Sequence, residues 1–247
     1  MQSINIEIAR KVLSVVDAGL VKGVGMPEPG QMCVEAAVCY AMGLPHGDDP
    51  ECVSRPLRSL KIRLNDSNWS STEARAKGLR RLALIQLGSR DAIDDREFVR
   101  RVVDLAIRKQ VPIALRAAAS VQKNSAHKAA LLDAATRCEK EGTREAALEA
   151  KKTAYAADAA AAADAAYAAY AAYAAADAAD AAAADAADAA NAANAAAYAA
   201  NAANAADAAD AAERDRVLSE FAEDVVQILI ELKAPGAQWL ELAPLAA

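Results

Sequence analysis

The stretch from Ala154 to Ala212 constrains the fold of this chain more than any other part of it. Of its 59 residues, 42 are alanine, and the remaining 17 are only aspartate, tyrosine or asparagine. Alanine has the highest helix propensity of all residues, because it loses almost no side-chain entropy on entering a helix. The stretch also lacks serine, threonine, cysteine, histidine, lysine and arginine. It therefore predicts helix, and it favours a structural or recognition role over catalysis.

The polar residues of this tract recur mainly at every third position, with occasional extra alanines between them. An α-helix turns by about 100° per residue, so the polar side chains wind around the helix and leave no constant apolar face. Two interpretations remain open: one long solvent-surrounded helix of roughly 90 Å, or a hairpin in which alanine faces allow two helices to approach closely. The single helix is favoured, because no Gly or Pro between Gly142 and Pro235 supplies a turn.

Composition divides the chain into three parts, residues 1–142, 143–212 and 213–247. Regularly spaced Leu, Ile and Val predict a helical globular domain in the first part, which the Ala-rich helical repeat follows. The third part predicts an amphipathic helix, whose apolar face comprises Val217, Leu218, Phe221, Val225, Ile228, Leu229 and Leu232. A face this apolar has to be buried. We expect it to pack on the globular domain, with a homo-oligomer as the alternative.

No run alternates between apolar and polar residues for long enough to predict a strand, so the predicted fold class is all-α. Two helix starts are predicted from capping boxes, in which a short polar residue precedes a glutamate by three positions. Ser70 pairs with Glu73 in the first, and Asp94 pairs with Glu97 in the second.

The charges of the chain are unevenly distributed. Residues 1–152 hold 25 Lys and Arg against 19 Asp and Glu, whereas residues 153–247 hold 3 against 15. No apolar run reaches the roughly 20 residues that span a bilayer, and residues 1–9 do not resemble a signal peptide. The four cysteines show no Cys-x-x-Cys spacing. A reduced, cytoplasmic protein without membrane contact is expected.

The densest polar group comprises Gln31, Cys33, Glu35, His46, Asp48, Asp49 and Cys52. Thiolate and imidazole are zinc ligands, so Cys33, His46 and Cys52 are candidate ligands of a zinc ion, the one cofactor that the sequence suggests. Alternatively, Cys33 near a helix start would be a nucleophile with His46 as its base and Asp48 or Asp49 as the residue that orients the base.

A structural interpretation of the same group is favoured. The cysteines would be small buried residues, and Glu35 would lie at a helix N-terminus, where the helix dipole stabilises a carboxylate. Asp48 or Asp49 would cap a helix that begins near Cys52.

A second group is basic and comprises Arg55, Arg58, Lys61, Arg63, Arg75, Lys77, Arg80 and Arg81. Arg55, Arg58, Arg80 and Arg81 are the candidate contacts of a nucleic acid. Aromatic residues for base stacking are nearly absent from this stretch, Trp69 being the exception, and no helix-turn-helix pattern is evident. Nucleic acid is therefore an unfavoured partner, and these charges are interpreted as solvated helix faces.

Four motifs carry a resemblance to a known group of proteins: residues 33–37 (CVEAA), 43–53 (GLPHGDDPECV), 64–69 (LNDSNW) and 225–240 (VVQILIELKAPGAQWL). Together with residues 75–87, they resemble a family of uncharacterised bacterial and phage helical proteins. The Ala-rich tract resembles, by composition, the helices of proteins proposed to act in bacterial immunity. The resemblance implies a recurring helical module with an Ala repeat of variable length, and it assigns no activity.

These patterns favour a non-enzymatic protein-interaction or scaffold protein, with immunity or phage–host conflict as the setting that the resemblance suggests. The globular domain would bind another protein, and the tyrosines of the repeat would add contacts, since Tyr is enriched at interfaces. The candidate contact residues are Tyr167, Tyr170, Tyr173 and Tyr198. The competing hypotheses are the zinc or cysteine site at Cys33, His46 and Cys52, and the basic face.

Overall fold

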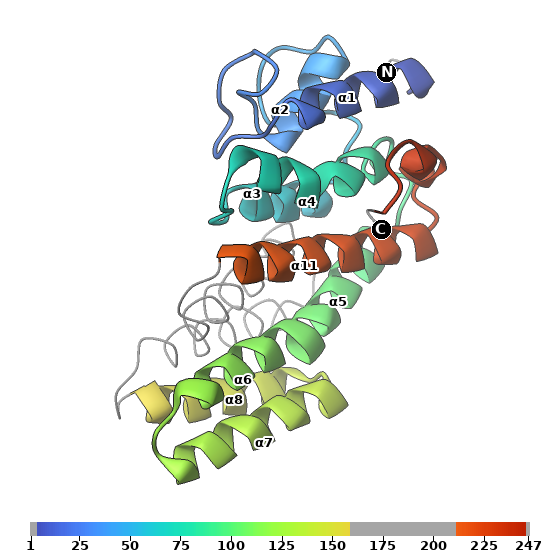
Figure 1. Ribbon diagram of the computed structural model, residues 1–247. Helices are drawn as coiled ribbons and strands as arrows, with labels where there is room; N and C mark the ends of the chain where they lie inside the picture. The colour runs from blue at the N-terminus through green and yellow to red at the C-terminus, as the bar shows by residue number, and fades with distance from the viewer. Residues whose placement is uncertain (1–3, 159–210, 246–247) are drawn as a thin grey trace.

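The computed structural model describes residues 4–158 and 211–245 (Figure 1). These residues form nine α-helices and no β-strand, so the all-α fold class is confirmed. The helices are α1 (Ile6–Asp17), α2 (Val34–Ala41), α3 (Arg55–Asn65), α4 (Thr72–Ile85), α5 (Asp95–Leu105), α6 (Val111–Val121), α7 (Ser125–Glu141), α8 (Arg144–Asp158) and α11 (Ala211–Glu231). A π-helical turn, η1 (Ala106–Gln110), joins α5 to α6, and a 3₁₀ segment, η2 (Pro235–Leu242), follows α11.

One predicted cap residue, Asp94, is confirmed, although the Glu97 carboxylate binds Arg100 and Arg101, and the other cap lies one residue away from its predicted position. Asp94 caps α5, accepting hydrogen bonds from the backbone N–H groups of Arg96 and Glu97. Helix α4 is capped by Ser71 instead of Ser70. The backbone N–H and the hydroxyl of Ser70 both donate to the carboxylate of Asp215 on α11. Ser70, which the local sequence predicts as the cap, therefore binds a residue that is distant in the chain instead.

The predicted helix start near Cys52 is wrong, because α3 begins only at Arg55. Pro56 lies in its first turn, where the missing N–H and the fixed φ of proline are compatible with a helix. Asp48 and Asp49 do not cap a helix. Both carboxylates lie within ion-pair distance of the Arg58 guanidinium, at 2.8 and 3.4 Å.

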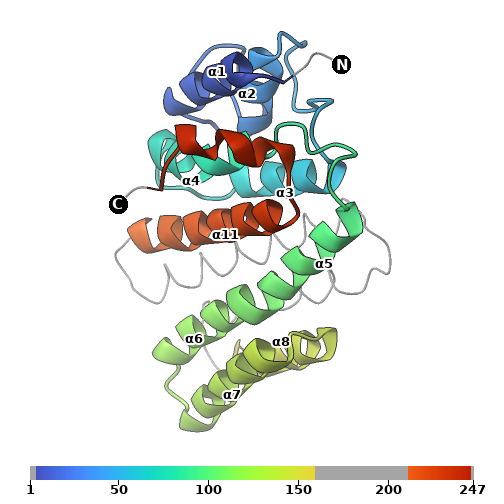
Figure 2. The same cartoon turned by 90° about the vertical axis from the view of Figure 1, so that its right-hand side faces the viewer.

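Helix α4 forms the centre of the N-terminal part of the fold, where it packs against α1, α2, α11 and η2. Its leucines are buried on several sides, as expected for a helix surrounded by others. The apolar face of α11 is buried mainly along α4, and both views show α11 lying between α4 and α5 (Figures 1 and 2). A Cβ atom on Gly78 of α4 would lie 2.4 Å from the Trp69 ring and 2.8 Å from the hydroxyl of Ser219 on α11, so glycine permits this close approach.

The second part of the fold contains three helices rich in alanine, α6, α7 and α8. The chain runs through α5, η1 and α6 without a break, turns into α7, and returns as α8 after Gly142, which adopts the left-handed conformation common at helix C-termini. Helix α7 packs against both α6 and α8. The guanidinium of Arg108 donates to the carbonyls of Glu139, Lys140 and Glu141, which are the last carbonyls of α7.

The described beginning of the Ala-rich tract is packed and not surrounded by solvent. Ala154 and Ala157, within the last two turns of α8, are both buried. The Gln122 amide, just after α6, donates to the carbonyl of Ala157. Residues 159–210 lie outside the described part of the chain. The two interpretations of the repeat, a long helix or a hairpin, therefore stay predictions. The division at residues 142 and 212 stays a prediction.

None of the described helices is both long and apolar enough to cross a bilayer.

Candidate functional site

The polar residues that the sequence singled out gather around a buried ion pair between α2 and α3. The Lys61 ammonium lies 2.7 Å from a carboxylate oxygen of Glu35, and neither side chain has any exposed surface. Glu35 does lie in the first turn of α2, as expected, but it is inside the core. The sequence analysis missed Lys61 as its partner by placing it on a solvated face. The spacing of Lys61 from Leu57 and Leu64 could have shown that it lies on the inward face of α3.

Apart from their contact with each other, the two charged groups have few polar partners. Neither oxygen of Glu35, nor the Lys61 nitrogen, makes a hydrogen bond of good geometry with any described part of the chain. Burial raises the pKa of Glu35, although the positive charge of Lys61 acts to lower it. Burial lowers the pKa of Lys61, although the negative charge of Glu35 acts to raise it. The contact therefore holds two groups whose charged forms the core disfavours.

Cys33 has a structural role at the start of α2. It is the N-cap residue, and its sulfur accepts a hydrogen bond from the backbone N–H of Ala36 at 3.3 Å. Burial raises its pKa, and this favours the thiol over the thiolate that a nucleophile or a metal ligand requires.

The other candidate residues of the zinc and nucleophile hypotheses have separate partners. The His46 Nε2 atom lies 3.0 Å from the carbonyl oxygen of Gly25. The Cys52 thiol donates to the Met42 sulfur, and Asp48 pairs with Arg58. Within residues 4–158 and 211–245, no three His, Cys, Asp or Glu side chains are placed to hold a metal ion. In the described structure these contacts lie within or next to two loops, residues 18–33 and 42–54.

The first of these loops is held by side chains from α3 and α4. The Asn65 amide donates to the carbonyl of Val21 and accepts from the backbone N–H of Val34. Asp66 accepts from the N–H of Gly23 at 2.8 Å. The buried guanidinium of Arg75 donates to the carbonyls of Leu20 and Asn65. Unlike the Glu35–Lys61 pair, these polar groups have hydrogen-bond partners.

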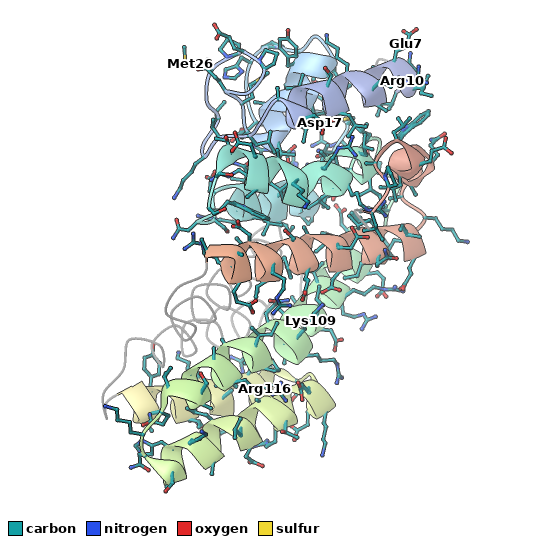
Figure 3. All side chains as sticks on the ribbon, in the orientation of Figure 1. Glu7, Arg10, Asp17, Met26, Lys109 and Arg116 are labelled. Carbon is teal, nitrogen blue, oxygen red and sulfur yellow. The ribbon has the colours of Figure 1, made fainter. Side chains whose placement is uncertain are left out.

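Backbone bonds within the loop complete its shape. Gly25 and Met32 form an antiparallel bridge, and the N–H of Met26 donates to the carbonyl of Gln31 at 2.7 Å. A Cβ atom on Gly25 would lie 1.9 Å from that carbonyl oxygen, and its φ is +73°, so only glycine fits there. Next to it, Met26 is 60% exposed. Figure 3 shows its side chain at the outer edge of the N-terminal part.

The basic residues do not form one face. Arg80 makes a two-point ion pair with Asp17 of α1, and Arg81 pairs with Glu223 of α11, so these adjacent arginines bind different helices. Arg58 is bound to Asp48, and Lys61 and Arg75 are buried. Of the four candidate contacts of nucleic acid, Arg55 is the exposed residue that carries no ion pair in the described structure. Arg63 and Lys77 of the same basic group are also exposed, so three of its eight charges have no ion pair within the described residues.

A shallow groove of about 620 Å³ lies between α4 and the N-terminal half of α11. Its walls carry both signs of charge, and most of these charges are paired, as Arg216 is with Glu213 and Glu220. Lys77 is exposed. The groove therefore has no single charge that would select a ligand.

No protein-family model matches the chain, and no curated protein or solved structure does.

Proposed function

We propose that this protein is a non-enzymatic interaction protein that binds another protein through the tip of the loop at residues 18–33. The exposed Met26 side chain on a rigidly held loop carries this proposal. Methionine is adaptable and enriched at interfaces, and binding residues are often found on loops that a rigid scaffold positions. A large apolar side chain that is held out at the edge of a well-ordered loop is suited to enter a pocket on a partner.

The surrounding polar residues support the same proposal. Asn65, Asp66 and Arg75 bind backbone groups of the loop, so the shape of the loop is set before any partner arrives. Preorganisation of this kind lowers the entropic cost of association. Contacts with residues distant in the chain fix the shape of the loop, as expected if a partner recognises that shape.

A photoreactive methionine analogue at position 26 tests the proposal in a cell extract. The matched control carries the same analogue in place of Leu132 on α7, which is 40% exposed and far from the loop in sequence. We expect a discrete crosslinked protein from position 26 and none from position 132. Met26→Ser should weaken binding of that protein at least ~10-fold, and Leu132→Ser should leave it unchanged. Equal crosslinking from both positions would refute the proposal.

The tyrosines of the repeat are a second proposed contact. Tyr167, Tyr170, Tyr173 and Tyr198 lie outside the described residues, so the support is their composition alone. Replacing all four by alanine preserves helix propensity. If they contribute, the identified partner should bind more weakly to this variant than to the parent. Unchanged binding would exclude these four tyrosines from the interface.

A further inference from the structure

The Glu35–Lys61 pair differs from the other buried polar groups around it. Asn65 and Arg75 are buried and bind backbone carbonyls or N–H groups. The pair has the same depth, but within residues 4–158 and 211–245 its atoms lack such partners. A buried ion pair without additional hydrogen bonds recovers only part of the hydration that its two charges lose. Of these groups, the pair is the one that would gain most from contact with water.

The pair also joins a helix with few neighbours to one with several. Among the described helices, α3 packs mainly against α2, whereas α2 also packs against α1 and α4. Lys61 comes from α3 and Glu35 from α2, so separation of these two helices would expose both charges together. On the outer side of α3, Arg58 and Asp48 are already partly in solvent.

We propose that the Glu35–Lys61 pair makes α2 and α3 a locally opening unit, in which the two helices separate and the pair becomes hydrated while α4 and α11 stay folded. Local opening below the free energy of global unfolding is common in proteins, and it follows the least stable contiguous unit. Because both loops are attached to α2 or α3, the opening would release residues 18–33 and 42–54 from their fixed positions. The inference does not depend on the proposed partner.

The chain contains its own reporters of this opening. Cys33 and Cys39 belong to the α2 region, and Cys52 lies in the loop before α3. Burial raises the pKa of all three, and the charge of Glu35 adds to the rise. The fourth cysteine, Cys138, is buried in α7, in the other part of the fold. Opening of α2 and α3 should therefore expose three thiols and leave Cys138 covered.

Alkylation of the native protein by N-ethylmaleimide, followed by mass spectrometry of each cysteine peptide, tests the proposal. Rates are divided by those of the same peptides in the urea-unfolded chain, which removes differences in intrinsic reactivity. We expect Cys33, Cys39 and Cys52 to react at similar corrected rates, at least ~10-fold faster than Cys138. A common rate for all four thiols, equal to that of global unfolding, would overturn the proposal.

A charge-free double variant identifies the cause. Glu35→Leu with Lys61→Met should slow alkylation of the three thiols ~10-fold or more, because apolar side chains no longer gain from hydration. The matched control replaces a partly exposed pair, Lys109→Met with Asp224→Leu, and should leave these rates unchanged. Equal rates in the parent and the charge-free variant would overturn the role of the pair.

Amide hydrogen exchange of the parent protein covers the case in which the double variant does not fold. Amides of α2 and α3 should share one opening free energy that is lower than that of α4. Protection of α2 and α3 equal to that of α4 would overturn the proposal.

Discussion

The N-terminal part of the molecule, from α1 to α4, and the α6–α8 helices belong to the same fold class but are held together differently. Of the buried polar or charged residues in the described structure, eight lie between residues 35 and 89, and the ninth is Gln110. The α6–α8 helices bury mainly alanine, including Ala118, Ala147 and Ala150. The first region buries long-range polar contacts, whereas the second buries mainly small side chains that approach closely.

The difference shows how each region tolerates change. A polar contact between distant segments is lost when either partner is removed, because the remaining group stays buried and unpaired. An interface of alanines loses little when one methyl group is removed, but it has no room for a larger side chain. The following predictions test this contrast, from the largest expected effect to the smallest.

Breaking the buried pair on one side should have the largest effect. Lys61→Met leaves the Glu35 carboxylate buried without its partner, and we expect it to lower the free energy of unfolding by about 3–5 kcal/mol. Glu35→Leu together with Lys61→Met should recover most of that loss. Urea unfolding monitored by circular dichroism measures both. Additive losses in the double variant would contradict a direct interaction between the two side chains.

The free energy of unfolding of the Lys61→Met variant should also fall as the pH rises. Burial already raises the pKa of Glu35 above its ordinary value of 4.5, and loss of the ammonium raises it further. The folded state then keeps a proton that the unfolded chain releases. Stability is therefore fully present below pH 4.5 and is lost as the pH rises through the folded-state pKa, by about 1.4 kcal/mol per unit at most. Urea midpoints from pH 4 to 8 measure this, and the charge-free double variant should lack the slope.

Enlarging a side chain should disrupt the alanine region. Ala147 is fully buried in α8, and Ala147→Leu should cost about 1–3 kcal/mol, because the neighbouring helices would have to move apart. Ala130→Leu, on the exposed face of α7, is the matched control and should change stability by less than about 0.5 kcal/mol. Thermal unfolding compares them. A neutral Ala147→Leu would show that the helices are not closely packed there.

The smallest predicted effect is the difference in stability between alanine variants of the two serines before α4. Ser71→Ala removes the hydrogen bond that Ala74 donates to the cap and should cost about 1 kcal/mol. Ser70→Ala removes an exposed contact with Asp215 and should cost less, although the local sequence favours Ser70 as the cap. The reverse order in urea unfolding would support the capping box that the sequence predicts.

Much of the helical structure could be predicted because it depends on residues close together in the chain. Asp94 caps α5 as its spacing from Glu97 indicates, and the apolar face of α11 is buried. The predictions that failed depend on distant partners or on proline. Ser70 is bound by Asp215, and α3 starts at the turn containing Pro56 instead of near Cys52.

The candidate site was only partly visible in the sequence. Cys33, Glu35 and Cys52 stood out as a polar group, and the favoured interpretation of buried cysteines agrees with their burial. Lys61 did not stand out, because a lysine in a basic stretch is normally solvated. The exposed position of Met26 could not be read from its residue type, since methionine is as common in cores as on surfaces that bind partners.

The sequence by itself determined that this chain is helical and where most helices lie, because helix propensity, apolar spacing and end caps act over a few residues. The tertiary structure decided which charges are paired: Lys61 with Glu35, Arg81 with Glu223, and Arg80 with Asp17. Such pairs depend on distances between segments far apart in the chain, and those distances exist only once the helices have packed.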